Sequence, residues 1–285
     1  MDRAGRGERL AEVNRPGDAD RASEVTSLRD AYGASASAWD RGPSRLYDEL
    51  ARMIVEPLAG ELAGHLVLDV GAGTGALSRA LRTVGATPLA LDVSAEMLAR
   101  ARGAASLAVI GDMLALPFLD SAFDAALAGF AISHVEAPEL ALAEMRRVVA
   151  PGGLVVAAVF GASPPSAAKE AIEEVAAGFG FRRPEWYVTF KTVTEPRSNT
   201  PDLLRGCAEA AGLTQIAILD LVAAGLDAPQ EIVECRLGMA HLAPFVESLP
   251  APRRAAFLAS AIEEVRRRGQ PLTPRVLVLS SRAPD

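Results

Sequence analysis

One segment, residues 67–75 with the sequence Val-Leu-Asp-Val-Gly-Ala-Gly-Thr-Gly, constrains the fold more than any other. Its first half is mostly apolar, and Gly71, Gly73 and Gly75 follow before an amphipathic stretch begins at Ala76. Glycine adopts left-handed backbone conformations, and without a Cβ it lets a ligand approach the main chain. A helix that begins after such a turn presents free N–H groups. The segment therefore predicts a strand, a ligand-binding turn and a helix.

The pairing of a short apolar run with an amphipathic stretch repeats along the chain. Strands that are apolar on both faces and alternate with helices are typical of a parallel sheet covered on both sides. We therefore predict an α/β fold with a doubly wound, Rossmann-like, seven-stranded and mostly parallel sheet whose last strand is antiparallel. The expected strands are 66–70, 87–93, 106–110, 123–129, 153–160, 213–222 and 274–281, and the expected helices of the repeat begin at Ala76, Ala95, Pro138 and Pro201.

Two interruptions of this repeat divide the chain into segments. Ligands of doubly wound sheets bind beyond the carboxyl ends of the strands, so long insertions after late strands are placed to roof the ligand crevice. The expected segments are a disordered tail at 1–24, N-terminal helices at 25–64, the ligand-binding core at 65–160, a lid insertion at 161–199 with a helix near 166–179, and the rest of the sheet at 200–285 with a second insertion at 225–272, whose two helical stretches are joined through 242–252.

Charge and hydrophobicity narrow the class of partner. The chain has 36 acidic and 29 basic residues, a formal charge of −7, whereas binding to a nucleic-acid backbone requires positive charge. The longest apolar run, residues 154–160, is far shorter than the roughly 20 residues that span a bilayer. We therefore expect a cytoplasmic protein that binds neither nucleic acid nor membrane, and a homodimer is compatible with the sequence.

The glycine turn alone does not identify the ligand, but residues near it in the predicted fold narrow the choice. Gly71, Gly73 and Ala76 also fit the dinucleotide fingerprint, which a nicotinamide enzyme would share. Asp92 ends the next strand, where a carboxylate can accept hydrogen bonds from both ribose hydroxyls. Asp112, in the Gly-Asp-Met segment after the third strand, is a feature that a dinucleotide site does not require.

Together these motifs resemble the class I S-adenosylmethionine-dependent methyltransferases, especially the small-molecule branch with the ubiquinone and menaquinone enzymes. The resemblance is clear over residues 65–160, includes the Ala-Pro-Gly-Gly turn at 150–153, and is looser over the later strands. It implies that the core binds S-adenosyl-L-methionine and releases S-adenosyl-L-homocysteine. The implied cofactor-binding residues are Asp69, Gly71, Ala72, Gly73 and Gly75 beside the methionine part, Asp92 at the ribose, Val93, Asp112 and Met113 at the adenine, Gly129 and Phe130 at the methionine end, and Tyr32 as a cover.

Methyl transfer is mostly a matter of alignment, and a base is needed only where the acceptor must lose a proton. His134 follows the fourth strand at the ligand end of the sheet and is the best candidate for a catalytic base. His65 precedes the first strand, at the opposite end, where a structural role is expected. His241 lies in the second insertion, where it either lines the acceptor pocket or packs.

The sequence gives the least information about the identity of the methyl acceptor. Trp186, Tyr187 and Phe190 in the first insertion either stack on a planar acceptor or form the interior of the lid, and Tyr32 and Trp39 either cover the cofactor or pack between helices. The apolar and aromatic composition of the insertions predicts a small, largely apolar acceptor, as in secondary metabolism, methylated on O, N or C. No acidic ligand set is visible, so no metal is expected.

Two alternatives remain open. The same motifs would bind the cofactor in a protein that catalyses a rearrangement or cyclisation without methyl transfer, or that acts as a binding module. A nicotinamide oxidoreductase is supported by the glycine match, and the Gly-Asp-Met segment at 111–113 counts against it.

Overall fold

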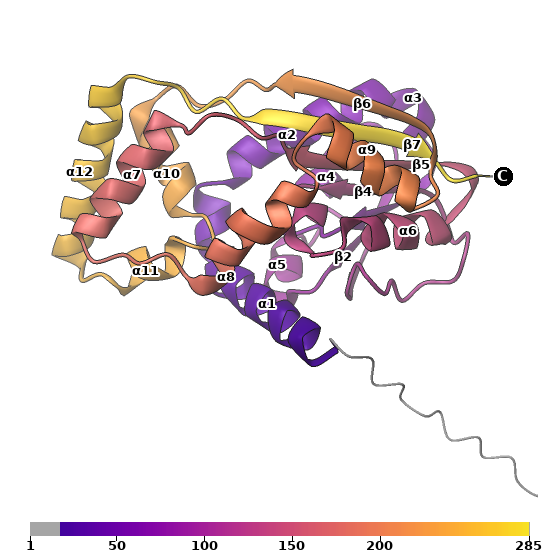
Figure 1. Ribbon diagram of the computed structural model, residues 1–285, viewed down its shortest axis with the longest axis horizontal. Helices are drawn as coiled ribbons and strands as arrows, with labels where there is room; N and C mark the ends of the chain where they lie inside the picture. The colour runs from indigo at the N-terminus through magenta and orange to yellow at the C-terminus, as the bar shows by residue number, and fades with distance from the viewer. Residues whose placement is uncertain (1–17, 285) are drawn as a thin grey trace, which may run out of the picture.

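The computed structural model describes residues 18–284 and contains the predicted doubly wound sheet (Figure 1). The seven strands lie in the order β3-β2-β1-β4-β5-β7-β6. β7 runs antiparallel to both neighbours, and the other pairs are parallel, so the predicted fold class is confirmed. The strands are β1 (Leu66–Val70), β2 (Thr87–Asp92), β3 (Leu107–Ile110), β4 (Phe123–Gly129), β5 (Val149–Phe160), β6 (Thr214–Val222) and β7 (Arg275–Arg282).

Alternate residues of the central strands face two separate hydrophobic cores. Val67 of β1 packs with helices α2 (Ser44–Val55) and α4 (Ala76–Thr83), whereas its neighbour Leu68 packs with α6 (Pro138–Val148) and α9 (Pro201–Ala210). Successive side chains of a strand point to opposite faces, so a strand covered on both sides must be apolar throughout. Asp69 breaks this rule in the middle of the sheet, where it is fully buried.

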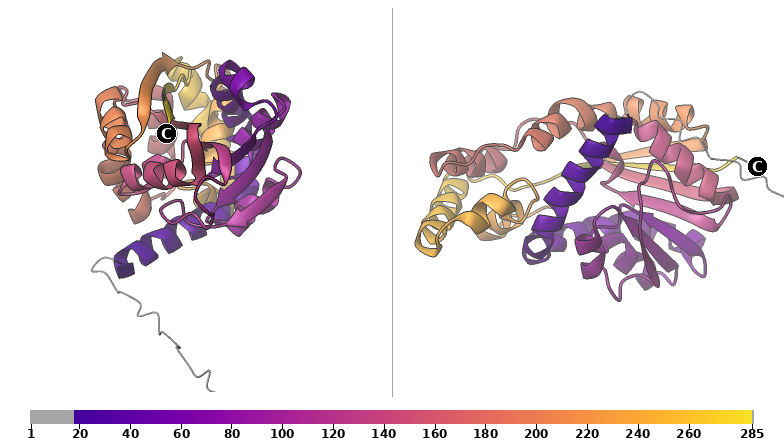
Figure 2. Two further views of the ribbon diagram at one scale, coloured as in Figure 1. Left: turned by 90° about the vertical axis from the view of Figure 1, so that its right-hand side faces the viewer. Right: turned by 90° about the horizontal axis from the view of Figure 1, so that it is seen from below.

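The N-terminal helices are longer than predicted. Helix α1 (Asp18–Arg41) begins inside the expected tail, so residues 18–24 are helical, while residues 1–17 lie outside the described part of the chain. No proline or glycine occurs in the sequence between Asp18 and Gly33, so no residue of this stretch opposes a helix. The predicted helices at 25–64 continue as α2, η1 (Glu56–Leu58) and α3 (Ala59–Leu62). Figure 2 shows α1 crossing between the sheet, where it contacts α5 (Ala95–Arg100), and a separate group of helices.

That group is formed by the two insertions, which pack on each other beyond one end of the sheet (Figure 1). The first contributes α7 (Ala167–Gly178), α8 (Glu185–Thr189), η3 (Phe190–Thr194) and η4 (Glu195–Arg197). The second contributes α10 (Pro229–Leu237), α11 (Ala243–Ser248) and α12 (Ala251–Arg268). The prediction of two helical stretches in the second insertion was wrong, because α11 forms within the expected connection. Its Phe245 packs against Phe181 and Phe257, which gives the short helix a tertiary anchor.

The second insertion starts and ends at one point of the fold. Leu226 and Leu272 exchange two backbone hydrogen bonds of 3.0 and 2.9 Å, which hold its ends together. Within residues 18–284, no helix combines the length and the apolar character that crossing a bilayer would require.

Candidate active site

A cleft opens at the carboxyl ends of β1, β2 and β4, where the predicted ligand crevice lies. Every predicted cofactor-binding residue except Gly75 lines it, as does His134. Gly75 instead precedes α4 with a φ of 85°, and a Cβ there would lie 3.0 Å from the side chains of Ala101 and Ala104. Gly75 thus packs against Ala101 and Ala104 and does not line the cleft.

The glycine turn has the geometry that its sequence predicts. Gly71 has a φ of 69°, and a Cβ on it would lie 2.4 Å from the Cβ of Ala131. Gly73 has a φ of 54°, and a Cβ on it would meet nothing within 4 Å. Since Gly73 also lines the cleft, its bare Cα leaves room for a ligand against the main chain.

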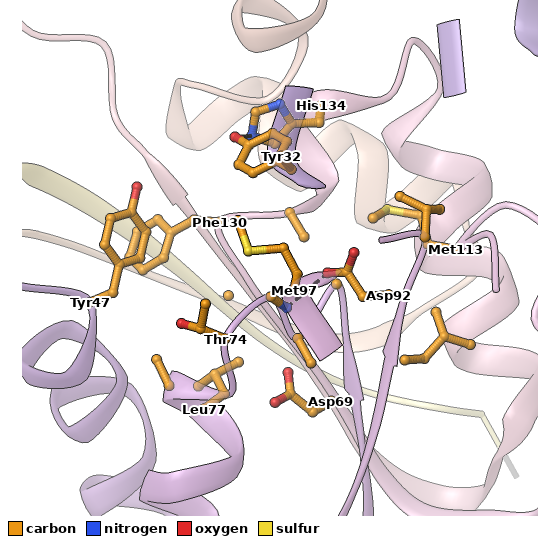
Figure 3. A pocket seen from close by; sticks show the side chains of 18 of the residues that line it. Tyr32, Tyr47, Asp69, Thr74, Leu77, Asp92, Met97, Met113, Phe130 and His134 are labelled. Atoms are coloured by element: carbon orange, nitrogen blue, oxygen red, sulfur yellow. Dashed lines mark hydrogen bonds between the residues drawn. The ribbon is translucent and has the colours of Figure 1, made fainter. Parts of the chain in front are cut away.

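Asp69 reaches the floor of the cleft from the centre of β1 (Figure 3). Its Oδ2 accepts a 2.6 Å hydrogen bond from the Ser78 hydroxyl, while its Oδ1 is buried with no hydrogen-bond partner among the described residues. Burial raises the pKa of Asp69 to about 7, even though the Ser78 hydrogen bond lowers it. A buried acceptor without a partner is costly, so this oxygen is suited to a cationic or N–H group of a ligand.

Asp92 stands at the end of β2 and ties the glycine turn to the next strand. Its Oδ2 accepts from the backbone N–H of Gly73 at 2.8 Å, and its Oδ1 accepts from the N–H of Ser94 at 2.9 Å. Burial raises the pKa of Asp92 against the lowering effect of these bonds. A carboxylate oxygen has more than one acceptor site, so both oxygens can still accept from ribose hydroxyls. Asp112 and Met113 line the far side of the same cleft.

Phe130 closes the other end of the cleft in a strained conformation. Its φ of 61° is left-handed, which is uncommon for a bulky residue and is found where surrounding structure holds it. Its N–H donates to the carbonyl of Ala158 at 2.8 Å, and its ring stacks on Phe160 at 4.4 Å. Tyr47 packs edge-on against Phe130 at 5.5 Å and also lines the cleft. Tyr47 was not predicted at this site, although its place on an amphipathic helix before β1 was a signal of inward orientation.

His134 and Tyr32 form a hydrogen-bonded pair above the cleft (Figure 3). The Tyr32 hydroxyl lies 3.0 Å from His134 Nε2. Burial, with a smaller effect of Lys191, lowers the pKa of His134 to about 4, so the imidazole is neutral near pH 7. Burial and the nearby Asp92 raise the pKa of Tyr32, whose hydroxyl keeps its proton. The neutral imidazole can accept a proton, as the prediction for His134 requires.

A second and larger cavity adjoins the first. Tyr32, Tyr47, Phe130 and His134 line both spaces, and the rest of the second one is formed mainly by the insertions. The three aromatic residues predicted at an acceptor pocket, Trp186, Tyr187 and Phe190, all line it.

Two stacked pairs of rings form part of its wall. Phe190 stacks on His134 at 4.3 Å, and Tyr187 stacks on His241 at 3.8 Å. His241 is buried and lines the cavity, so it both lines the pocket and packs. His65 is exposed, and its Nδ1 lies 2.7 Å from the carbonyl of Glu61, away from either cavity.

Charge in the second cavity was not foreseen from the apolar composition of the insertions. Besides aromatic rings, charged side chains from both insertions line it, namely Lys169, Glu170, Glu173, Glu174, Arg183, Lys191, Glu195 and Arg236. All of these residues except Arg183 lie on helices, where charged side chains in the sequence look like those of a solvated face. Within residues 18–284, no three His, Cys, Asp or Glu side chains are grouped so that they could hold a metal ion.

A family model described as a methyltransferase domain matches residues 68–157, which include most of β1, the glycine turn and most of the cleft. The chain is 42% identical over 111 residues to a demethylmenaquinone methyltransferase of Renibacterium salmoninarum, covering 38% of this chain and 47% of that protein. It is 37% identical over 134 residues to a malonyl-acyl-carrier-protein O-methyltransferase of Pectobacterium atrosepticum, covering 45% and 51%. The chain thus spans about half the length of these curated relatives.

Solved structures share the fold of the methyltransferase domain and its surroundings. The phosphoethanolamine N-methyltransferase 2 of Haemonchus contortus, solved with phosphomonomethylethanolamine and S-adenosylhomocysteine, aligns with a TM-score of 0.53 at 18% identity, over 83% of this chain and 52% of that one. The 4+2 cyclase SpnF aligns with a TM-score of 0.53 at 22% identity, over 83% of this chain and 81% of that one. At these identities the likeness concerns the fold.

Proposed function

We propose that the chain is an S-adenosyl-L-methionine-dependent methyltransferase that methylates a small molecule on O, N or C. One observation carries the proposal. The cleft lined by the predicted cofactor residues meets a second cavity at His134 and Tyr32, so a bound cofactor and an acceptor would approach each other there. The names of the relatives that the methyltransferase domain matches support the same chemistry.

The residues of the first cleft fit this cofactor. Asp92 would hold the ribose, Gly73 would leave space for the methionine part, and the Oδ1 of Asp69 would accept from its ammonium group. When bound, the cofactor supplies a methyl group on a positively charged sulfur, which is itself a good leaving group. The protein then needs mainly to align the acceptor and exclude water.

His134 is the proposed base for acceptors that must lose a proton. Its neutral ring, held by Tyr32 and stacked on Phe190, stands where the two cavities meet. A proton taken by the ring would create a cation in a desolvated place, which its low pKa shows to be unfavourable. We therefore propose that proton removal accompanies methyl transfer rather than precedes it.

Calorimetric titration with S-adenosylmethionine, S-adenosylhomocysteine and NAD tests the cofactor. We expect micromolar binding of the two sulfur nucleosides and none of NAD; binding of NAD alone would contradict the proposal. The transfer is tested with a radiolabelled methyl group against phenols, amines and polyketide-like acceptors. A product formed without consumption of the cofactor would instead identify a rearrangement or cyclisation.

Partners and location are part of the proposal. The charge of −7 argues against nucleic acid, and the free cysteines Cys207 and Cys235 suit a reducing cytoplasm. A homodimer is tested by light scattering on the purified protein, and the location by cell fractionation.

A further inference from the structure

Arg236, on α10, stands out among the charged groups of the second cavity. Its side chain is only 7% exposed, yet its Nε is buried with no hydrogen-bond partner in the described part of the chain. Its Nη2 lies 3.2 Å from Nε2 of His241 and 3.6 Å from the Oε1 of Glu173. A guanidinium offers five N–H donors, and leaving a buried charged donor without a partner is costly. Arg236 thus has donor capacity that the protein itself does not satisfy.

The charges around Arg236 do not balance. Glu173 is shared, because it also forms an ion pair with Arg183. Lys191 is paired with Glu195. The remaining carboxylates of this wall, Glu170 and Glu174, form ion pairs with Arg268, which does not line the cavity.

Lys169 adds an unpaired positive charge. It lines the same cavity from the first turn of α7, and its ammonium group has no hydrogen-bond or ion-pair partner among residues 18–284. Partial desolvation and the proximity of Arg236 lower the pKa of Lys169 to about 8, so it stays mostly protonated near pH 7. Once the pairs of Glu170 and Glu174 with Arg268 and of Arg275 with Asp220 are set aside, four cations among the described lining residues face two carboxylates, namely Lys169, Arg183, Lys191 and Arg236 against Glu173 and Glu195.

Aromatic rings lie between this cluster of cations and His134, where the second cavity meets the cleft of the predicted cofactor. His241, which contacts Arg236, stacks on Tyr187, and Tyr187 lies 6.0 Å from Phe190, which stacks on His134. Burial and the surrounding cations lower the pKa of His241 to about 2, so it is neutral and can accept a hydrogen bond from Arg236. The cavity therefore has an apolar, aromatic middle between the site of methyl transfer and a cluster of cations.

We infer that Arg236 and Lys169 form an anion-binding subsite, and that the methyl acceptor carries a carboxylate or phosphate group at the end remote from the methylated atom. This inference rests on the proposed methyl transfer. A planar guanidinium suits either oxyanion, and the aromatic wall suits an apolar or planar segment between the anion and the reacting atom.

The test compares matched probes on protein saturated with S-adenosylhomocysteine. Three probes are titrated calorimetrically at constant ionic strength: 4-hydroxycinnamate, its uncharged methyl ester, and phenyl phosphate. We expect at least one of the two anions to bind about tenfold or more tightly than the ester, a preference of roughly 1.4 kcal/mol. The tighter of the two anions identifies the oxyanion. Equal affinity for anions and ester, or no binding of either anion at millimolar concentration, would overturn the subsite.

Two variants assign the preference to these residues. Lys169→Met removes an exposed and unpaired charge and should fold normally, whereas Arg236→Gln changes a buried group and is checked by its melting temperature. Both should lose most of the preference for the anion. Arg254→Gln, on the exposed face of α12 outside the cavity, removes the same charge and should keep it. A preference that survives in both variants would refute the assignment. Unchanged binding of S-adenosylhomocysteine in all variants keeps this result separate from a failure of the cofactor site.

Discussion

Replacing Gly73 by alanine should weaken cofactor binding while the protein still folds. The φ of 54° at Gly73 is left-handed, a conformation that costs a residue with a Cβ about 1–2 kcal/mol. With about 2.1 cal/mol/K of unfolding entropy per residue, a chain of 285 residues should melt only about 2–3 °C lower. The added methyl meets no protein atom within 4 Å, so it points into the space of the cleft. Overpacking there should cost a bound ligand about 1–3 kcal/mol, or roughly 5- to 150-fold in affinity.

Gly103 provides the control, because it isolates the strain of the backbone. Its φ is 84°, a Cβ on it would also meet nothing within 4 Å, and it lies outside the cleft. Gly103→Ala should therefore lower the melting temperature by a similar amount and leave the affinity for S-adenosylhomocysteine unchanged. Calorimetric titration and thermal melting of both variants check this. If Gly73→Ala binds as tightly as the wild type, the cofactor does not lie against this turn.

Three further predictions concern the carboxylates and the histidine. Asp92→Ala should weaken S-adenosylhomocysteine binding at least tenfold, about 1.4 kcal/mol, by titration; unchanged affinity would remove Asp92 from the ribose site. Because Asp69 has a raised pKa of about 7 and binds a cation only when ionised, affinity should fall about tenfold from about pH 8 to about pH 6 as the carboxyl is protonated. Asp69→Asn keeps an oxygen that can accept the hydrogen bond of Ser78, but it should bind S-adenosylhomocysteine more weakly and without this pH dependence. A pH profile identical to that of the wild type would contradict the role of Asp69. His134→Ala should slow turnover more than it weakens acceptor binding in steady-state kinetics, and an unaltered kcat would exclude His134 as the base.

The sheet and the glycine turn could be predicted because their signals are local. A strand buried on both faces must be apolar throughout, and a left-handed turn requires glycine, so β1 and Gly71 can be located without knowing what surrounds them. Asp69 was visible as one polar residue in an apolar strand. Its hydrogen bond to Ser78 was not, because that contact depends on how α4 packs on the sheet.

The residues that were missed owe their position to contacts between distant segments. Lys169 looks like an ordinary solvated residue of an amphipathic helix, and it lines a cavity only because α7 packs near α10 and α12. Arg236 lies 67 positions away along the chain and is buried by the same packing. Helix α11 was read as a connection because its six residues are too few for a periodic signal, and aromatic contacts with other helices stabilise it.

The bridge between Leu226 and Leu272 means that the second insertion leaves and re-enters the rest of the fold at a single place. The 45 residues between them begin and end at this pair of backbone hydrogen bonds. Gly225 allows the two chain segments to come this close, because a Cβ on it would lie 1.9 Å from the carbonyl oxygen of Leu272. The entropy of loop closure depends only weakly on loop length, so a change in the number of residues between these ends costs little in chain entropy. In evolution, the segment between these two points, which are adjacent in space, can therefore be replaced by another. The acceptor would then change while the residues that bind the methyl donor are retained.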